Sequence, residues 1–219
     1  MNEAMKHTAT NGFCAIILGA ACAVSTGATG LNDLENFVKT VKSGRADFTQ
    51  AVTAPAKDGQ AARTKNSSGT FEFARPNRFK FLYKKPFEQS IVADGQTLWL
   101  LDVDLNQVTA RQQSKVMGST PAALIASAPD LKALQADFTL ADAPDKAAMQ
   151  WVEATPKAKD SSLQSVRVGF KGGAFAVLEI LDSFGQRSTM TFSAFQANAP
   201  MDAGSFQFKP PAGADVIRQ

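Results

Sequence analysis

The feature that most constrains this chain is an alternation of apolar and polar residues over positions 68–84. Aromatic residues take every second place in two stretches, and charged residues fill most of the places between them. Successive side chains of a strand point to opposite faces of its sheet, so the pattern predicts strands with one apolar and one polar face. The aromatic positions are Phe71, Phe73, Phe79, Phe81 and Tyr83.

The same two-residue period recurs along most of the chain and predicts an antiparallel meander. Asp94-Gly95 separates two apolar runs, and this dipeptide is a strong signal of a tight hairpin. We expect further strands at 48–52, 91–92, 98–103, 107–113, 138–140, 149–154, 163–170, 175–181 and 188–195, with exposed loops at 141–146 and 156–162. A long antiparallel sheet of this kind curls rather than staying flat.

Two segments change to helical spacing. Residues 31–43 predict an amphipathic helix, with Asn32 and a glutamate three places later as a capping box and Gly44 as its end. Residues 120–127 predict a second helix, because a threonine cap precedes a proline at the first helical position. A short turn of helix is expected at 131–134. These helices would cover the open side of the curled sheet.

The N-terminus has the layout of a secretory leader. Lys6 precedes the apolar run 13–24, and small residues follow at 25–30. The run is shorter than the roughly 20 apolar residues that a membrane-spanning helix needs. We therefore expect residues 1–28 to be a cleaved signal peptide and residues 29–219 to form one domain in the periplasm. The alternative is a buried N-terminal helix.

Removal of that leader would take with it every cysteine and the single histidine of the chain. Cys14, Cys22 and His7 all lie inside it. A mature chain without these residues has no His-based triad, no thiol nucleophile and none of the usual zinc ligands. Phosphate-loop and serine-hydrolase motifs are absent from the sequence as well. We therefore expect no enzyme activity, no metal and no cofactor.

Three alternatives stay open at this point. Cys22 follows a weak lipidation-box pattern, which would make the protein lipid-anchored. Residues 102–106 imitate the start of a calcium loop, but Gln107 stands where that loop needs glycine, which favours an ordinary turn. A pair of carboxylates could still serve a glycosidase.

The composition points to binding of something apolar. The chain has 16 Phe but one Tyr and two Trp, and phenylalanine buries area without needing a hydrogen-bond partner. An ordinary core and an apolar cavity both explain this excess. The net charge of +3 is spread along the chain with no basic block, which argues against nucleic acid as a partner.

Several short motifs, taken together and in order, resemble a known family. They are Phe48-Thr49-Gln50, Arg75-Pro76-Asn77, Asp94-Gly95 with Thr97-Leu98-Trp99, Thr120-Pro121 with Leu124-Ile125-Ala126, and Phe206-Gln207-Phe208. With the stretch 69–112 they resemble the LolA-type lipoprotein carriers of Gram-negative bacteria. The resemblance covers nearly the whole expected mature chain.

The resemblance implies both a fold and a function. The fold would be an incomplete, open antiparallel β-barrel with a lid of short helices over an apolar cavity. The function would be that of a monomeric periplasmic carrier for acylated outer-membrane lipoproteins. It would take them from an inner-membrane ATP-driven transporter and pass them to an outer-membrane receptor. The alternative is a lipid-anchored receptor, or another exported lipid-binding module, of the same fold.

The resemblance also implies roles for particular residues. Arg75 would latch the lid by hydrogen bonds, and Pro121, Leu124 and Ile125 would belong to that lid. Ala122 and Ala123 depart from the bulkier residues expected there. The residues expected to line the acyl-chain cavity are Phe71, Phe73, Phe79, Phe81, Ile91 and Leu98.

A carrier of acyl chains must also release them. Each buried methylene contributes about 0.8 kcal/mol, so one long chain contributes on the order of 10 kcal/mol. Several fully buried chains would approach irreversible binding. Because the sequence has no phosphate loop, we expect incomplete burial of the cargo, with lid closure opposing its binding.

Overall fold

The computed structural model describes residues 1, 29–56, 61–116, 126, 128–202 and 204–219. Within them lie the helices α1 (Gly30–Thr40), α2 (Gln113–Val116) and α4 (Leu131–Asp137). The strands are β1 (Ser43–Thr53), β2 (Thr64–Ala74), β3 (Arg78–Lys85), β4 (Gln89–Asp94), β5 (Thr97–Asp102), β6 (Gln107–Gln112), β7 (Phe138–Lys146), β8 (Met149–Pro156), β9 (Leu163–Lys171), β10 (Ala174–Asp182), β11 (Arg187–Ala197) and β12 (Asp215–Arg218). In this part of the chain, no helix is both long enough and apolar enough to cross a membrane.

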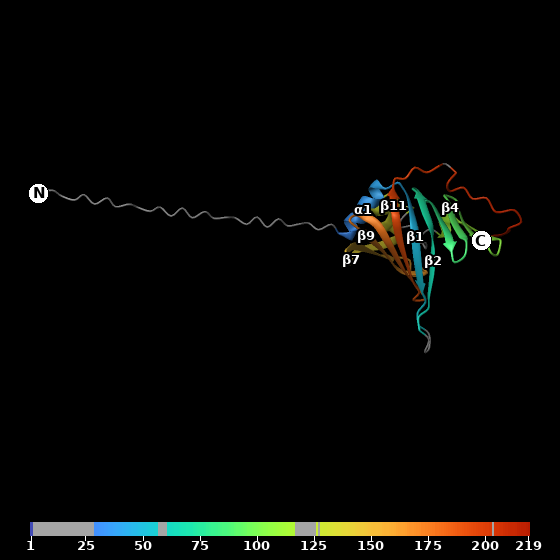
Figure 1. The fold of residues 1–219 in the computed structure, drawn as a ribbon, viewed down its shortest axis with the longest axis horizontal. Helices are drawn as coiled ribbons and strands as arrows, with labels where there is room; N and C mark the ends of the chain where they lie inside the picture. The colour runs from blue at the N-terminus through green and yellow to red at the C-terminus, as the bar shows by residue number, and fades with distance from the viewer. Residues whose placement is uncertain (2–28, 57–60, 117–125, 127, 203) are drawn as a thin grey trace.

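The strands form one curved, open sheet (Figure 1). Its order is β12-β6-β5-β4-β3-β2-β1-β11-β10-β9-β8-β7. The two meanders of the chain meet at β1, which pairs with β2 on one side and with β11 on the other. β7 and β12 are the outermost strands of the described sheet and do not pair with each other, so the barrel stays incomplete. This confirms the predicted open antiparallel architecture.

The first helix is capped about one turn earlier than the sequence pattern predicts. Thr29 is its cap, and the Thr29 side chain accepts a hydrogen bond from the Asn32 amide at 3.3 Å. The assignment of Asn32 as the cap was therefore wrong. The helix ends at Thr40, and Gly44 lies inside β1 rather than ending the helix. A Cβ at Gly44 would come within 2.5 Å of the Phe73 ring, so close packing explains this glycine.

The core is a layer of phenylalanine side chains between α1 and the concave face of the sheet. Leu34, Phe37 and Val38 of α1 are buried against it. The Phe37 ring lies 5.5–6.1 Å from four other rings, which come from β2, β9, β10 and β11. These distances suit tilted and edge-on aromatic contacts. The helix thus covers part of the apolar face (Figure 1).

Two strand assignments differ from the sequence-based expectation. Residues 141–146 were expected to form a loop, but β7 continues through them and pairs with β8. β7 is an edge strand with most of its side chains exposed, so its outer half lacks the apolar alternation that marks a half-buried strand. β12 was not expected at all. It pairs in parallel with β6, and four residues carry too little pattern to be recognised.

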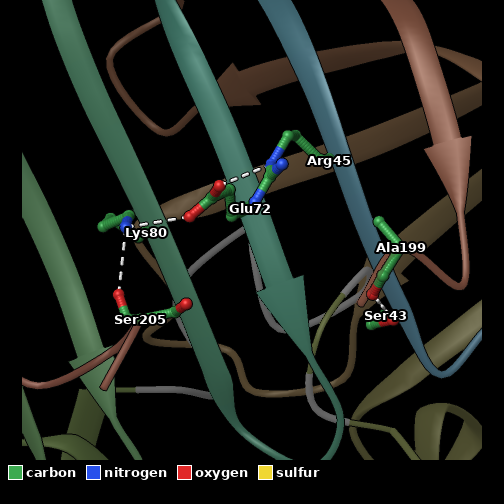
Figure 2. A network of polar contacts seen from close by, with 6 residues as sticks. All are labelled: Ser43, Arg45, Glu72, Lys80, Ala199 and Ser205. Atoms are coloured by element: carbon green, nitrogen blue, oxygen red, sulfur yellow. Dashed lines mark hydrogen bonds and ion pairs between the residues drawn. The ribbon is translucent and has the colours of Figure 1, made fainter. Parts of the chain in front are cut away.

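The convex face carries an ion-pair network (Figure 2). Glu72 on β2 bonds Arg45 at 2.6 Å and Lys80 at 2.8 Å, and the Glu72 side chain is only 14% exposed. The Lys80 ammonium also donates to the backbone carbonyl of Ser205 at 3.0 Å (Figure 2). The network therefore joins β1, β2 and β3. It also fastens the C-terminal segment, residues 199–208, to the convex side through Ser205.

Further contacts hold that C-terminal segment in place. The Ser43 hydroxyl donates to the carbonyl of Ala199 at 2.7 Å (Figure 2). The Phe208 ring stacks on Trp99 at 5.2 Å, and the Trp99 indole donates to Asp94 at 2.8 Å. The segment therefore lies against the convex face of β3 and β5, opposite the concave face that carries Phe79, Phe81 and Leu98.

Candidate functional site

An apolar pocket of about 270 Å³ lies on the concave face. Side chains from seven strands line it, and eight of its eleven lining residues are apolar. Sites of this kind bind hydrocarbon by burial, with a few polar groups that set orientation. The lining residues are Gln50, Phe79, Phe81, Tyr83, Ile91, Leu98, Leu100, Arg111, Leu178, Ile180 and Met190.

The six residues predicted for the cavity fall into two groups. Four line the pocket, namely Phe79, Phe81, Ile91 and Leu98. Phe71 and Phe73 do not line it; both are 0% exposed and belong to the core. The Phe71 ring stacks on Phe81 at 4.4 Å, so it supports the pocket wall from behind. Their assignment to acyl-chain contact stays a prediction.

Sequence reasoning did not single out the pocket residues of the second meander. Leu178 and Ile180 come from β10 and Met190 from β11, while Leu100 lies two places after Leu98 on β5. The alternation along β10 and β11 could have indicated which side chains share a face. It could not show that β11 pairs with β1 and so brings this face opposite β3.

Arg75 lies at the end of β2 with its guanidinium inside the protein. Its Nε donates to the carbonyl of Val41 at 2.9 Å, and its Nη1 donates to the carbonyl of Ala128 at 2.8 Å. The guanidinium also lies over the rings of Phe37 and Phe73, at 5.4 and 5.6 Å. Burial lowers the pKa of Arg75 to about 10, so the side chain stays charged at neutral pH.

The turn after β2, which begins at Arg75, makes a second contact with the chain near Ala128. The amide of Asn77 donates to the carbonyl of Ala126 at 3.1 Å, and Asn77 has a φ of 63°, which asparagine tolerates better than most residues. Gln113 is 2% exposed and donates to the carbonyl of Asn77, while its side-chain oxygen accepts from the Gly95 amide at 3.0 Å. The turn thus connects Ala126 and Ala128 to the β4–β5 hairpin.

The residues predicted to form the lid, Pro121, Leu124 and Ile125, lie outside the described residues, as do Ala122 and Ala123. The described residues directly after that segment are the ones that Arg75 and Asn77 hold.

No group of three or more histidine, cysteine, aspartate or glutamate side chains that could hold a metal ion occurs among the described residues. At the turn that imitates a calcium loop, Asp102 accepts a hydrogen bond from the Leu105 amide at 3.1 Å. That is the ordinary role of aspartate in a turn.

The fold and the site define a β-rich module, with an open antiparallel sheet, an apolar pocket on its concave face and a buried arginine that bonds two backbone carbonyls. The family model described as outer membrane lipoprotein carrier protein LolA matches residues 39–209. The chain belongs to this family.

Curated relatives agree with the family match. A protein of Albidiferax ferrireducens named outer-membrane lipoprotein carrier protein is 74% identical, over 98% of this chain and 100% of its own length. A relative with the same name from Leptothrix cholodnii is 50% identical over 100% of both chains. These names favour a carrier over the lipid-anchored receptor considered above, and they imply an exported protein.

A solved structure supports the fold alone. A conserved protein from Thermus thermophilus, described as uncharacterized, has a TM-score of 0.51 with 11% identity. The match covers 86% of this chain and 96% of that one.

Proposed function

We propose that this protein carries lipoproteins through the periplasm by sheltering their acyl chains in the concave apolar pocket. Cargo would arrive from an ATP-driven transporter in the inner membrane and leave to a receptor on the outer membrane. Membership of the carrier family supports this route. The observation that carries the proposal is the apolar pocket on the concave face, in a fold that also contains the bond from Arg75 to Ala128. Such a role requires no catalytic residue.

The volume of the pocket supports the proposal that it widens when cargo binds. Pockets that bury small organic ligands measure roughly 300–1,000 Å³. The pocket here is about 270 Å³ with the Arg75 latch made, whereas lipoproteins bring several long chains. Movement of Ala126 and Ala128 away from the turn that follows β2 is the change that the contacts suggest, since one hydrogen bond holds each of them there.

The latch gives the carrier a way to release its cargo. A hydrogen bond from a charged donor contributes about 1.5–3 kcal/mol when formed inside a protein. Opening the Arg75–Ala128 bond would subtract this amount from the free energy gained by burying acyl chains. Reformation of the bond favours the empty carrier, so release does not depend on nucleotide hydrolysis by this protein.

Replacement of Arg75 by leucine tests the latch. The R75L variant should bind lipoprotein more tightly and transfer it to receptor-bearing membranes more slowly, because the empty state has lost its stabilising bonds. Arg78→Leu is a matched control, because it removes the same charge three residues away, at the start of β3. The Arg78 guanidinium lies over the Phe206 ring at 5.8 Å, and within the described part of the chain it has no bond to Ala126 or Ala128. Equal transfer rates for R75L and the wild type would contradict the latch.

Crosslinking tests the pocket itself. A photoreactive residue in place of Phe79, which lines the pocket, should trap acylated protein in periplasmic extracts. The same residue in place of Thr191 should not, because Thr191 follows the pocket-lining Met190 and is exposed on the opposite face of β11. Capture of unacylated protein alone at position 79 would overturn the carrier assignment.

A further inference from the structure

The concave face changes from apolar to polar at one end of the pocket. On β1 the side chain two places after Phe48 is Gln50, and on β3 the one two places after Phe81 is Tyr83. Since residues two apart on a strand share a face, Gln50 and Tyr83 extend the aromatic rows. On β11, Ser188 likewise extends the row of Met190. Three strands thus contribute a neutral polar group to the same end of the concave face.

These three side chains form a chain of hydrogen bonds. The Tyr83 hydroxyl donates to Gln50 Oε1 at 3.0 Å, and Gln50 Nε2 donates to Ser188 Oγ at 2.7 Å. Ser188 is 8% exposed and does not line the apolar pocket, so it holds the side-chain amide of Gln50 from behind. Burial raises the pKa of Tyr83 to about 12, which keeps its hydroxyl protonated. An amide nitrogen has two donors, so Gln50 Nε2 has one donor beyond its bond to Ser188.

Gln50 and Tyr83 lie where two hollows adjoin. Both line the apolar pocket, and both also line a second hollow of about 540 Å³. Ile91 is the third residue common to the two. Lys65 and Gln89, together with Asn66 and Ser67 of β2, make the outer hollow far more polar. An acyl chain in the inner pocket would therefore meet this pair of polar residues as it leaves toward the outer hollow.

We propose that Gln50, oriented by Tyr83 and Ser188, binds an ester carbonyl that joins an acyl chain to the polar part of the cargo. This inference rests on the proposed carrier function and adds a site for the head of the ligand. Acyl chains would extend from Gln50 into the inner pocket, and the peptide would leave through the outer hollow. Gln50 and Tyr83 carry no charge, which suits a neutral carbonyl. The site therefore distinguishes an acylated peptide from bare hydrocarbon.

A pair of ligands that differ only in the carbonyl tests this site. One is a short peptide with an N-terminal diacylglyceryl cysteine, and the other is its dialkyl analogue, in which ether links replace the esters. Both bury the same alkyl chains, but an ether lacks the carbonyl oxygen. The wild type should bind the diester about fivefold more tightly, as expected for a net contribution of one hydrogen bond.

Gln50→Met should abolish this preference, because methionine has similar length and no donor. Tyr83→Phe should reduce the preference by removing only the hydroxyl that orients Gln50. It also serves as the second variant if Gln50→Met fails to fold. Affinity for the ether ligand should stay unchanged in both variants.

The outcomes separate the two hypotheses. Equal affinity of the wild type for both ligands would overturn the carbonyl site and leave the carrier function standing. An undiminished preference for the diester in both variants would overturn it too. Failure of the wild type to bind either ligand would instead refute the proposed function.

Discussion

Replacing Phe71 with alanine tests whether the aromatic rows divide into core and pocket as described. Phe71 is 0% exposed, and its ring contacts those of Phe73, Phe81 and Phe192 at 4.4–5.7 Å. Truncation of a buried phenylalanine to alanine costs about 3–5 kcal/mol. Because aromatic pairs add about 0.5–1.5 kcal/mol beyond area burial, we expect the upper half of that range. That is a large part of the roughly 5–15 kcal/mol that stabilises a typical domain.

Urea denaturation followed by circular dichroism measures this loss, with an unchanged slope as the sign that only stability differs. Ile91→Ala is the matched comparison. Ile91 is half-buried, lines the pocket and packs at the edge of the core, so its truncation should cost about 1–2 kcal/mol, less than that of a fully buried side chain. If the two variants lose the same stability, or Phe71→Ala loses less than Ile91→Ala, the division into core and pocket is refuted.

Three further predictions concern the sheet. Gly69→Ala should lower the free energy of unfolding by about 1–3 kcal/mol in a urea titration, because the new Cβ would lie 1.9 Å from the backbone oxygen of Leu82. An unchanged urea midpoint would contradict this. Burial alone would raise the pKa of Glu72, but bonds to a lysine and an arginine lower it below 4.5. The carboxylate therefore stabilises the fold above that pH and loses this effect as pH falls through the lowered pKa. Glu72→Gln should be less stable than the wild type at pH 7, with the gap closing in acid. Asp94→Ala, which loses the indole bond of Trp99 and two turn amides, should be destabilised by more than Trp99→Phe, which loses one bond, in thermal unfolding at neutral pH.

The sequence was sufficient to predict the meanders, because two-residue alternation is a local property. The hairpin at Asp94-Gly95 and the face shared by Phe79 and Phe81 follow from it directly. β7 was shortened in the prediction because an edge strand with two exposed faces carries no alternation. The N-cap was misplaced because Asn32 and Thr29 are both good caps, and only the packing of α1 decides between them.

The pocket could be predicted only in part, for a different physical reason. Phe71 and Phe81 occupy the same face of neighbouring strands, and the same pattern describes both. What separates them is their distance from β11. The Phe71 ring lies 5.5 Å from the Phe192 ring of β11, whereas Phe81, on a strand one place farther from β11 in the sheet, lines the pocket. That distance depends on pairing of β1 with β11, which are separated by most of the chain. Local patterns carry no information about such pairing.

The contacts of Arg75 indicate why a latch here could open and close repeatedly. The carbonyl of Val41 that accepts from its Nε belongs to the cap residue of α1, at the negative end of the helix dipole. That bond and the contacts with the rings of Phe37 and Phe73 remain when the bond to Ala128 is broken, so they still hold the guanidinium. Opening the latch therefore breaks one bond of a side chain that stays ordered. Because little conformational entropy is lost when the bond reforms, most of its roughly 1.5–3 kcal/mol offsets the burial of cargo.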